Sequence, residues 1–321
     1  MNIVFIGAST FGLRCLDACF AAADVRVVGI VTAPQTFAIS YRPTGVTNVL
    51  HADFVTVAQA RHIPVEVLQG SMNDSALLDA VTAWKPDAFV VAGWYHMIPK
   101  LWRALAPAFG LHASLLPDYS GGAPLVWAMI NGETRTGITL FQMDDGVDSG
   151  PIAAQAEETI HPDDTIASLY ARIEERGLEV LRETLPGLAR GTLATRAQDE
   201  SKRRIFPQRG PEDGRIDWTQ DVACLDRFIR AQTRPYPGAF TTLNDKPFHI
   251  WSAQQVQRDH GVDFGQVEHF ASDQYHVACR GGFIRLLEVA YDGKTWFEAD
   301  LATLLGEGGQ QLGVLLGVLK A

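Results

Sequence analysis

The sequence predicts an α/β fold, in which a Rossmann-like, doubly wound, mostly parallel sheet is followed by a smaller C-terminal β-rich domain. Short apolar runs alternate with segments of helical periodicity up to about residue 143, and this β-α-β order is typical of doubly wound sheets. One run, Ala88–Gly93, is apolar throughout, as expected of a central strand buried on both faces. The length of 321 residues favours two domains over one core.

The elements of the first domain follow from this periodicity. Strands are predicted at Asn2–Gly7, Val25–Thr32, Pro64–Leu68, Ala88–Gly93, Gly110–Ser114 and Ile138–Met143. Helices are predicted at Phe11–Ala22, Asp53–Arg61, Asp74–Ala83, Ala123–Asn131 and Pro162–Leu185. The last helix begins with Pro-Asp-Asp-Thr, which supplies first-turn acids and capping groups.

The remainder of the chain reads as a linker, one helix and a set of short strands. Gln198–Gly214 is polar and contains Pro and Gly, which predicts a linker. A helix is predicted at Asp221–Thr233, and the short alternating runs that follow are Ala239–Leu243, Phe248–Ser252, His276–Ala278 and Phe283–Val289. We therefore predict a catalytic domain over residues 1–204 and a C-terminal domain over 205–321, OB-like in its β-rich part.

Composition narrows the class of protein. The formal net charge of −10 argues against a surface that binds nucleic acid mainly through phosphates. No uninterrupted apolar run is long enough to cross a membrane, and the N-terminus lacks the basic region of a secretion signal. The four cysteines have no metal-ligand spacing and are interpreted as buried free thiols. We expect a cytoplasmic protein without a membrane partner.

Three polar segments begin near the ends of predicted strands. They are Gly93–Pro99, His112–Pro117 and Asp144–Gly150. Ligands of doubly wound sheets bind beyond the carboxyl ends of the strands, so we expect all three segments at one rim. A histidine and a carboxylate brought together there can act as an acid–base pair. His112 and the acidic loop are therefore the strongest candidates for a functional site.

The same motifs could also suggest a metal site or a dinucleotide site. The carboxylates of Asp144, Asp145 and Asp148 lack the regular oxygen spacing of hard-cation loops, and we expect no metal. The turn from Gly7 to Gly12 has Ser9 where a dinucleotide fingerprint needs its middle glycine, so a nicotinamide cofactor is not expected.

Ser114 and the aromatic residues 94–96 also belong to the candidate site, and each has two interpretations. Ser114 lacks the G-x-S-x-G elbow of a nucleophile and fits a brace for the turn that follows, yet its hydroxyl lies close to His112 in sequence. Trp94, Tyr95 and His96 follow the central strand, and they could form core or wall a flat heterocycle.

Taken together, the motifs resemble the formyltransferases that use 10-formyltetrahydrofolate as donor, a family that includes methionyl-tRNA, glycinamide ribonucleotide and sugar N-formyltransferases. The matching segments are His112-Ala-Ser-Leu-Leu-Pro, Gly121-Gly-Ala-Pro, Asn131-Gly-Glu, Thr136-Gly-Ile-Thr, Gln142-Met-Asp and Gly146-Val-Asp148-Ser-Gly-Pro. The segments at 208–218 and 233–240 look most like the sugar-modifying members. The resemblance is weakest after about Ser252.

The resemblance implies a catalytic Asn-x-His motif with a distant aspartate. His112 and Asp148 match the histidine and the aspartate, but the asparagine position is Gly110, which has no side chain. Ser120 is a second departure, because several relatives carry arginine there. Ser114, His96 or a bound water could replace the missing amide.

The resemblance also implies where 10-formyltetrahydrofolate binds. Its pterin is expected against the backbone of His96, Met97 and Ile98 and against the loop of Asp144, Asp145 and Gly146. A flat heterocycle needs backbone donors and acceptors together with apolar walls, which favours binding over core for Trp94 and Tyr95.

The expected reaction is transfer of the formyl group to an amine, with a nucleotide-linked amino sugar or another small amine as the favoured acceptor. Methionyl-tRNA is the alternative, but the loop Ala33–Asn48 contains only one basic residue, Arg42, whereas a tRNA-contacting loop should be richer in cations. Hydrolysis of 10-formyltetrahydrofolate and non-catalytic folate binding are further alternatives. A homodimer is compatible with the sequence.

Overall fold

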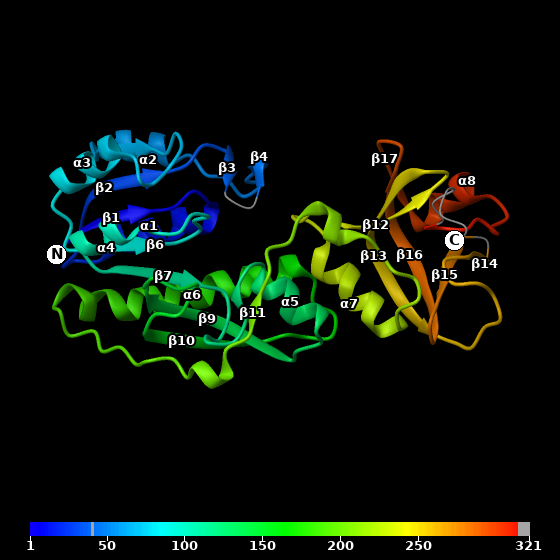
Figure 1. Cartoon of the computed structure of the whole chain (residues 1–321). Helices are drawn as coiled ribbons and strands as arrows, with labels where there is room; N and C mark the ends of the chain where they lie inside the picture. The colour runs from blue at the N-terminus through cyan, green and yellow to red at the C-terminus, as the bar shows by residue number, and fades with distance from the viewer. Residues whose placement is uncertain (40–41, 272, 314–321) are drawn as a thin grey trace, which may run out of the picture. The chain divides into compact units, whose positions relative to one another are not determined.

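The computed structural model describes residues 1–39, 42–271 and 273–313, and the chain divides into two compact units (Figure 1). Unit 1 comprises Met1–Pro124, Arg135–Thr159 and Ala171–Phe206. Unit 2 comprises Leu125–Thr134, Ile160–Tyr170 and Pro207–Ala321.

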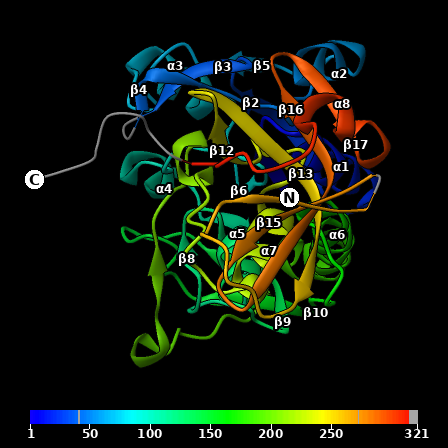
Figure 2. The same cartoon turned by 90° about the vertical axis from the view of Figure 1, so that its right-hand side faces the viewer.

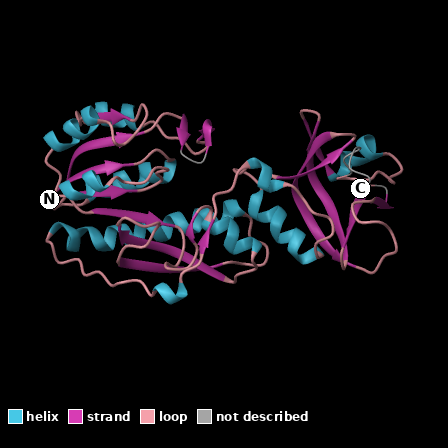
Figure 3. Cartoon of the chain, viewed as in Figure 1, coloured by secondary structure: helices cyan, strands magenta, loops and turns pink. Residues whose placement is uncertain are grey.

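Unit 1 contains a seven-stranded sheet that confirms the predicted fold class (Figures 1 and 3). Its strands, in spatial order, are β10 (Ile152–Thr159), β9 (Arg135–Gln142), β7 (Ala108–His112), β6 (Ala88–Val91), β1 (Asn2–Ile6), β2 (Arg26–Thr32) and β5 (Val65–Val67). The strands from β7 to β5 are mutually parallel. Because both faces of β1 are buried, successive residues of this strand enter two different cores.

Helices cover both faces of this sheet. One core contains residues of α1 (Thr10–Ala21), α2 (Phe54–Ala60) and the unit 1 part of α6 (Ile166–Ala189). The other contains residues of α3 (Ser75–Ala83) and α4 (Lys100–Leu105), where Trp102 is fully buried and donates its indole N–H to the Met72 carbonyl at 2.8 Å. The sheet is thus enclosed between two helical layers, as expected of a doubly wound fold.

The direction of β9 corrects one prediction. β9 pairs with β7 in antiparallel fashion, with Gln142 opposite Phe109. The acidic loop that follows Gln142 therefore starts level with the amino-terminal half of β7, and the expectation that it begins at the rim shared by the parallel strands is wrong. The loop connects β9 to β10 as a hairpin, so it must fold back along β7 to approach His112.

Two further segments differ from the sequence-based reading. Residues 33–48, expected as a loop, contain a hairpin of β3 (Thr36–Ile39) and β4 (Arg42–Thr47). Gln198–Gly214, expected as a linker, contains a 3-10 turn at Glu200–Lys202 and β11 (Ile205–Phe206), which pairs with β8 (Ser120–Gly121). The first half of this polar segment is therefore built into unit 1.

The turn after β1 is closed by the chain itself. Ser9 caps α1 by accepting from the Gly12 N–H at 3.1 Å, and the Thr10 N–H donates to the Leu50 carbonyl at 2.8 Å. These donors would face the phosphates in a dinucleotide site. The segment around Leu50 takes the place of such a ligand.

Unit 2 contains an antiparallel sheet packed against one helix (Figure 2). Its strands are β12 (Ala239–Leu243), β13 (Lys246–Gln257), β16 (Gly282–Tyr291), β15 (Gln274–Cys279) and β14 (Val267–Ala271), with β17 (Lys294–Phe297) paired to β16. The other regular elements in the described part of unit 2 are α5 (Pro124–Ile130), the start of α6, 3-10 turns at Pro211–Gly214 and Glu298–Asp300, α7 (Val222–Gln232) and α8 (Leu301–Leu305).

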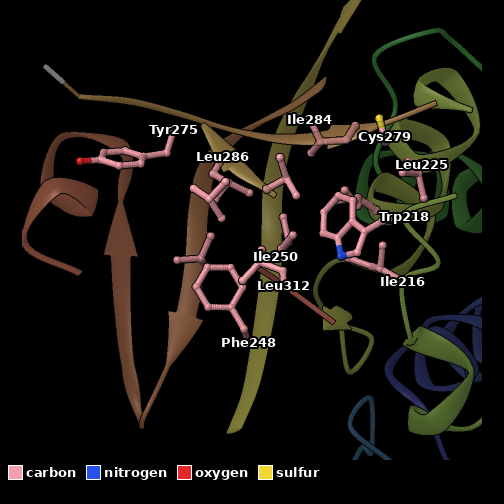
Figure 4. Close-up of a cluster of buried hydrophobic side chains, with 14 of the residues drawn as sticks. Ile216, Trp218, Leu225, Phe248, Ile250, Tyr275, Cys279, Ile284, Leu286 and Leu312 are labelled. Carbon is pink, nitrogen blue, oxygen red and sulfur yellow. The ribbon is translucent and has the colours of Figure 1, made fainter. Parts of the chain in front are cut away.

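The core of unit 2 lies between this sheet and α7. Figure 4 shows Phe248, Ile250, Ile284 and Leu286 of the sheet near Trp218, with Leu225 contributed by α7. These side chains are almost entirely removed from water. No helix among the described residues is long and apolar enough to cross a membrane.

His276, on the opposite face of β15 from this core, is only 6% exposed. Neither ring nitrogen has a hydrogen-bond partner among the described residues, and Phe270 packs against the ring with centroids 4.5 Å apart. Burial, with a smaller contribution from Arg285, lowers the pKa of His276 from 6.5 to about 4. The folded protein therefore holds this imidazole in its neutral form.

We expect unit 2 to lose stability as the pH falls from about 6.5 to about 4. The unfolded chain binds a proton at His276 in this interval and the folded chain does not, so the loss approaches about 3 kcal/mol. His276→Leu should flatten this dependence. The measurement is hydrogen exchange of β16 peptides in the full chain, corrected for the intrinsic effect of pH. An equally steep loss in the variant would contradict the assignment.

Candidate active site

His112 is the last residue of β7, and both of its ring nitrogens face oxygen acceptors. Nε2 lies 2.8 Å from the Tyr119 carbonyl oxygen, and Nδ1 lies 3.5 Å from Oδ2 of Asp148. The side chain is 11% exposed. A ring protonated on both nitrogens donates toward both oxygens, whereas a neutral ring leaves one nitrogen lone pair against an acceptor. Each ring nitrogen of His112 is therefore placed to donate to an oxygen when it carries a proton.

Asp148 reaches this position through a left-handed backbone conformation, with φ of 50°. Oδ2 accepts the Gly121 N–H at 2.8 Å, while Oδ1 accepts no hydrogen bond from the described part of the chain. A non-glycine residue in this region costs on the order of 1 kcal/mol and persists only where its surroundings enforce it. The loop folds back over β7 in this way, and the predicted neighbours His112 and Asp148 are brought together.

Ser114 braces the bend that follows His112. Its hydroxyl donates to the Asp118 carbonyl at 2.7 Å, and its own carbonyl accepts from the Thr139 hydroxyl at 2.6 Å. The residue is fully buried. Because the hydroxyl proton is already used inside the bend, Ser114 in this conformation has no donor to offer an oxyanion.

Met143 fills the space beside Gly110. Alternate residues of a strand share a face, so a side chain at position 110 would project on the same face as His112. A Cβ placed on Gly110 would lie 2.3 Å from the Met143 Cε atom and 3.5 Å from Phe141. The place that the resemblance assigns to an amide is thus taken by a thioether, which supplies no N–H donor.

The rest of the acidic loop is held by its own side chains and by α4. Asp144 accepts from the Gly146 N–H at 3.0 Å and from the Ser149 hydroxyl at 2.6 Å. Arg103 donates to Asp145 and, at 3.1 Å, to the Ile98 carbonyl. The hydrogen bond from Arg103 lowers the pKa of the exposed Asp145 carboxyl. Arg103 therefore ties together the two segments expected to hold the pterin.

The aromatic residues after β6 form a cluster with the β3–β4 hairpin. Phe37 contacts Tyr95 and His96 at centroid distances of 5.3 Å, and Trp94 contacts His96 at 5.4 Å. The buried atoms Trp94 Nε1 and His96 Nε2 lack a partner among residues 1–39, 42–271 and 273–313. Burial lowers the pKa of His96. The cluster therefore offers ring faces and unused polar atoms, the chemistry that suits a heterocycle.

The last two predicted pterin neighbours differ in exposure. Met97 is 59% exposed, while the side chain of Ile98 is buried. The Ile98 carbonyl is already bound by Arg103, so the backbone of His96 and Met97 carries the hydrogen-bonding capacity of this segment.

Ser120, the second departure from the resemblance, receives a cation from elsewhere in the chain. Arg203 Nη1 donates to its hydroxyl at 3.2 Å and to the Val147 carbonyl at 3.0 Å. Gln198 Nε2 donates to the carbonyls of Asp148 and Gly150, both at 2.7 Å. Sequence reasoning missed Arg103, Gln198 and Arg203, because single polar residues in polar segments carry no periodic signal.

Within the described ranges, no three His, Cys, Asp or Glu side chains are grouped so that they could hold an ion. Asp144 and Asp145 are instead used by the loop and by Arg103.

Comparison with known proteins agrees with this fold. A family model described as formyl transferase matches residues 1–185, and one described as formyl transferase C-terminal domain matches residues 209–301. The methionyl-tRNA formyltransferase of Myxococcus xanthus is 36% identical over 297 residues, which cover 91% of each chain.

Similar folds occur among solved structures. An N-formyltransferase from Helicobacter canadensis, in complex with folinic acid and dTDP-3-aminofucose, aligns with a TM-score of 0.63 at 17% identity, covering 88% of this chain and 98% of that one. HypX from Aquifex aeolicus, in complex with tetrahydrofolic acid, aligns with a TM-score of 0.62 at 19% identity. That alignment covers 96% of this chain but only 47% of HypX, so this chain spans about half of that protein.

A doubly wound domain with a histidine–carboxylate pair, followed by an antiparallel β unit, defines an enzyme of the group-transfer class. The family models and the Myxococcus xanthus relative cover most of the chain, so they identify the enzyme family. The chain belongs to the formyltransferase family, whose donor is a formyl-folate.

We expect Gly110→Ala to change the free energy of unfolding of unit 1 by less than about 1 kcal/mol, because the new Cβ meets only the mobile end of Met143. Gly137→Ala is the matched control in β9, where the Cβ would lie 2.3 Å from the Ala156 carbonyl oxygen of β10. It should cost about 1–3 kcal/mol. Urea denaturation of both variants measures the difference, and equal losses would show that Gly110 is required by the fold.

Proposed function

We propose that this protein transfers the formyl group of 10-formyltetrahydrofolate to a small amine, with a nucleotide-linked amino sugar as the favoured acceptor. The observation that carries the proposal is the placement of His112 Nδ1 beside Asp148 at the end of β7. One group there can donate a hydrogen bond and the other can accept a proton, and N-formyl transfer needs both.

In this reaction the amine nitrogen bonds to the formyl carbon, and the carbonyl oxygen gains negative charge. The bond from that carbon to N10 of the folate then breaks, and the amine proton must reach N10. Asp148 Oδ1, which accepts no hydrogen bond in the described chain, is placed to take the proton from the amine and to pass it to N10 as the carbon–N10 bond breaks. His112 is placed to donate a hydrogen bond from Nδ1 to the developing oxyanion, which becomes the carbonyl oxygen of the product.

The Tyr119 carbonyl gives His112 its orientation. By accepting from Nε2 at 2.8 Å, it leaves Nδ1 as the nitrogen directed at the reaction. The distance of 3.5 Å from Nδ1 to Asp148 is too long for a strong hydrogen bond. A proton on Nδ1 is therefore not locked to the carboxylate and can be shared with a bound group.

The absence of the amide at Gly110 shifts the work of oxyanion stabilisation to His112. One lost donor typically costs on the order of 10²–10³ in rate. His112 compensates because its side chain is only 11% exposed, and a hydrogen bond away from water is stronger than one in water. We infer a site in which one donor does the work that the resemblance divides between two.

The donor would bind along the segments joined by Arg103. The backbone of His96 and Met97 and the loop from Asp144 to Gly146 would meet the pterin edge, with Trp94 and Tyr95 beside it. The orphaned Trp94 Nε1 and His96 Nε2 support this placement, because buried polar atoms normally have partners. His96 is neutral at physiological pH, since burial lowers its pKa.

Charge favours a small acceptor. The formal net charge is −10, and Arg42 is the sole basic residue between positions 33 and 48 of the sequence. In the structure this segment is the β3–β4 hairpin next to the aromatic cluster, where Phe37 touches Tyr95 and His96. A hairpin that gripped tRNA phosphates should carry several cations. The Helicobacter canadensis enzyme, bound to dTDP-3-aminofucose, shows that a similar fold can take a nucleotide sugar.

Methionyl-tRNA is the second candidate acceptor. It is favoured by relatives that are methionyl-tRNA formyltransferases, including those of Myxococcus xanthus at 36% identity and Solibacter usitatus at 33% identity. Both matches cover at least 91% of this chain. The sequence likeness and the charge of the hairpin therefore point to different acceptors, and turnover decides between them.

We expect His112→Ala to lower kcat by about 10³-fold and Asp148→Asn by about 10²-fold, because the first removes the donor to the oxyanion and the second removes the acceptor of the amine proton. Production of tetrahydrofolate from 10-formyltetrahydrofolate in the presence of the amine measures both. His62→Ala, which alters an exposed histidine outside the site, serves as the control. Full turnover in His112→Ala would contradict the proposed mechanism.

We expect faster formylation of dTDP-3-aminofucose than of methionyl-tRNA. Both acceptors are tested at the same donor concentration, at about 150 mM and about 400 mM salt. Salt-sensitive formylation of methionyl-tRNA alone would favour the second candidate. Formate release without any amine would identify a hydrolase. Donor binding without turnover on any acceptor would identify a folate-binding protein.

A further inference from the structure

We propose that four residues of the segment Gln198–Phe206, namely Gln198, Arg203, Arg204 and Phe206, position both His112 and Asp148. The proposal rests on the proposed roles of these two residues. The segment lies between the regions matched by the two family models, which end at 185 and begin at 209. The structure places it within unit 1, in contact with the bend after His112 and with the loop that carries Asp148.

Gln198 and Arg203 hold the backbone of the acidic loop. The amide of Gln198 donates to the carbonyls on either side of Ser149, those of Asp148 and Gly150, both at 2.7 Å. Arg203 donates to the Val147 carbonyl at 3.0 Å. Three of the four loop carbonyls from Val147 to Gly150 thus accept from donors of one short segment.

The same segment holds the bend from Asp118 to Gly122 on its other side. The Ser120 N–H donates to the Arg204 carbonyl at 3.0 Å, and the Gly122 N–H donates to the Phe206 carbonyl at 2.9 Å. The Phe206 ring stacks on Tyr119 with centroids 4.5 Å apart and an interplanar angle of 7°.

An ion pair strengthens the contact between the segment Gln198–Phe206 and the bend. The Arg204 guanidinium makes two hydrogen bonds of 2.6 Å to the Asp118 carboxylate and lies 4.8 Å from the centre of the Tyr119 ring. Planar paired bonds of this type fix orientation as well as distance. The bend is therefore held by backbone pairing, by ring stacking and by an ion pair at once.

The bend and the loop are the two structures that touch the catalytic pair. The Tyr119 carbonyl accepts from His112, and the Gly121 N–H donates to Asp148. Tyr119 and Asp148 both have positive φ, at 54° and 50°. Such conformations of non-glycine residues persist only where neighbouring groups enforce them, and Gln198–Phe206 supplies neighbouring groups for both.

Arg203 connects the two sides. It donates to Val147 on the loop and to the Ser120 hydroxyl on the bend, and it also donates to Gln198 at 3.3 Å and to Glu200 at 2.7 Å. Its side chain is 10% exposed although it is charged. A guanidinium with its donors spread over both structures fixes their separation, and thereby the distance between His112 and Asp148.

Arg203 and Gln198 are positioning residues, since they touch neither reacting group of the pair directly. A displacement of about 1 Å at a catalytic group can cost on the order of 10²-fold in rate. We therefore expect Arg203→Met and Gln198→Ala to lower kcat by about 10- to 100-fold. The KM for 10-formyltetrahydrofolate should stay within about twofold, because the hydrogen bonds from Gln198 and Arg203 to the loop go to residues 147, 148 and 150 and not to residues 144–146.

The matched control is Lys202→Ala, which removes a neighbouring cation that is 74% exposed and paired only with Asp199 among described residues. It should leave kcat unchanged. Arg203→Lys should recover part of the lost rate, since an ammonium can still bridge two carbonyl or hydroxyl acceptors. Gln198→Glu should be worse than Gln198→Ala, because a carboxylate would face two carbonyl oxygens.

Coupling to Asp148 separates positioning from general loss of structure. In the Asp148→Asn background, Arg203→Met should lower kcat by less than about twofold, since the group that it positions is already disabled. Thermal melting of each variant checks the fold. An undiminished effect in this background, or wild-type kcat in both Arg203→Met and Gln198→Ala, would overturn the proposal. If His112→Ala also turned over normally, the proposed function itself would be wrong.

Discussion

The site depends on one contact, the approach of the Asp148 carboxylate to the His112 ring. The antiparallel direction of β9 places the start of the acidic loop away from the end of β7, so sheet topology alone does not bring these two side chains together. The loop must fold back, and it does so by placing Asp148 at φ of 50°. Donors on several sides then hold that conformation. The surrounding hydrogen bonds of the bend, the loop and the segment after α6 can all be understood as the means of keeping this contact in place.

A second constraint is the exchange of an amide for a thioether beside the histidine. Gly110 has no positive φ and its nearest obstacle is the tip of Met143, so the backbone does not require glycine here. The site has an apolar wall where the resemblance places a donor, and this wall lies on the same face of β7 as His112. Under the proposed mechanism, His112 is then the donor that remains near the formyl oxygen on that face. We therefore expect its orientation by Tyr119 and its distance from Asp148 to affect the rate more strongly than in a site with two donors.

Sequence reasoning recovered the parallel part of the sheet, its helices and the pairing of His112 with Asp148, because apolar periodicity and strand-end placement have direct physical causes. It misjudged β9, since a buried strand is apolar in either direction and the short helix before it looked like a crossover. It missed the β3–β4 hairpin, although Phe37 and Ile39 alternate with exposed residues. The predicted domain limit and site roles rested on motifs. The contacts of Gln198 and Arg203 could not be predicted, because a hydrogen bond to a carbonyl distant in sequence does not change the local composition.

The polar character of residues 198–206 illustrates why composition misleads at such places. A linker is polar because its backbone and side chains face water. This segment is polar because its side chains replace water at the carbonyls of another loop, and Arg203 is 10% exposed while Lys202 beside it is 74% exposed. The two cases give the same sequence signal and opposite consequences for function. The loop that carries Asp148 is not held next to His112 by the sheet, so other residues must hold it there. The segment that follows α6 and pairs with β8 contacts both this loop and the bend after His112.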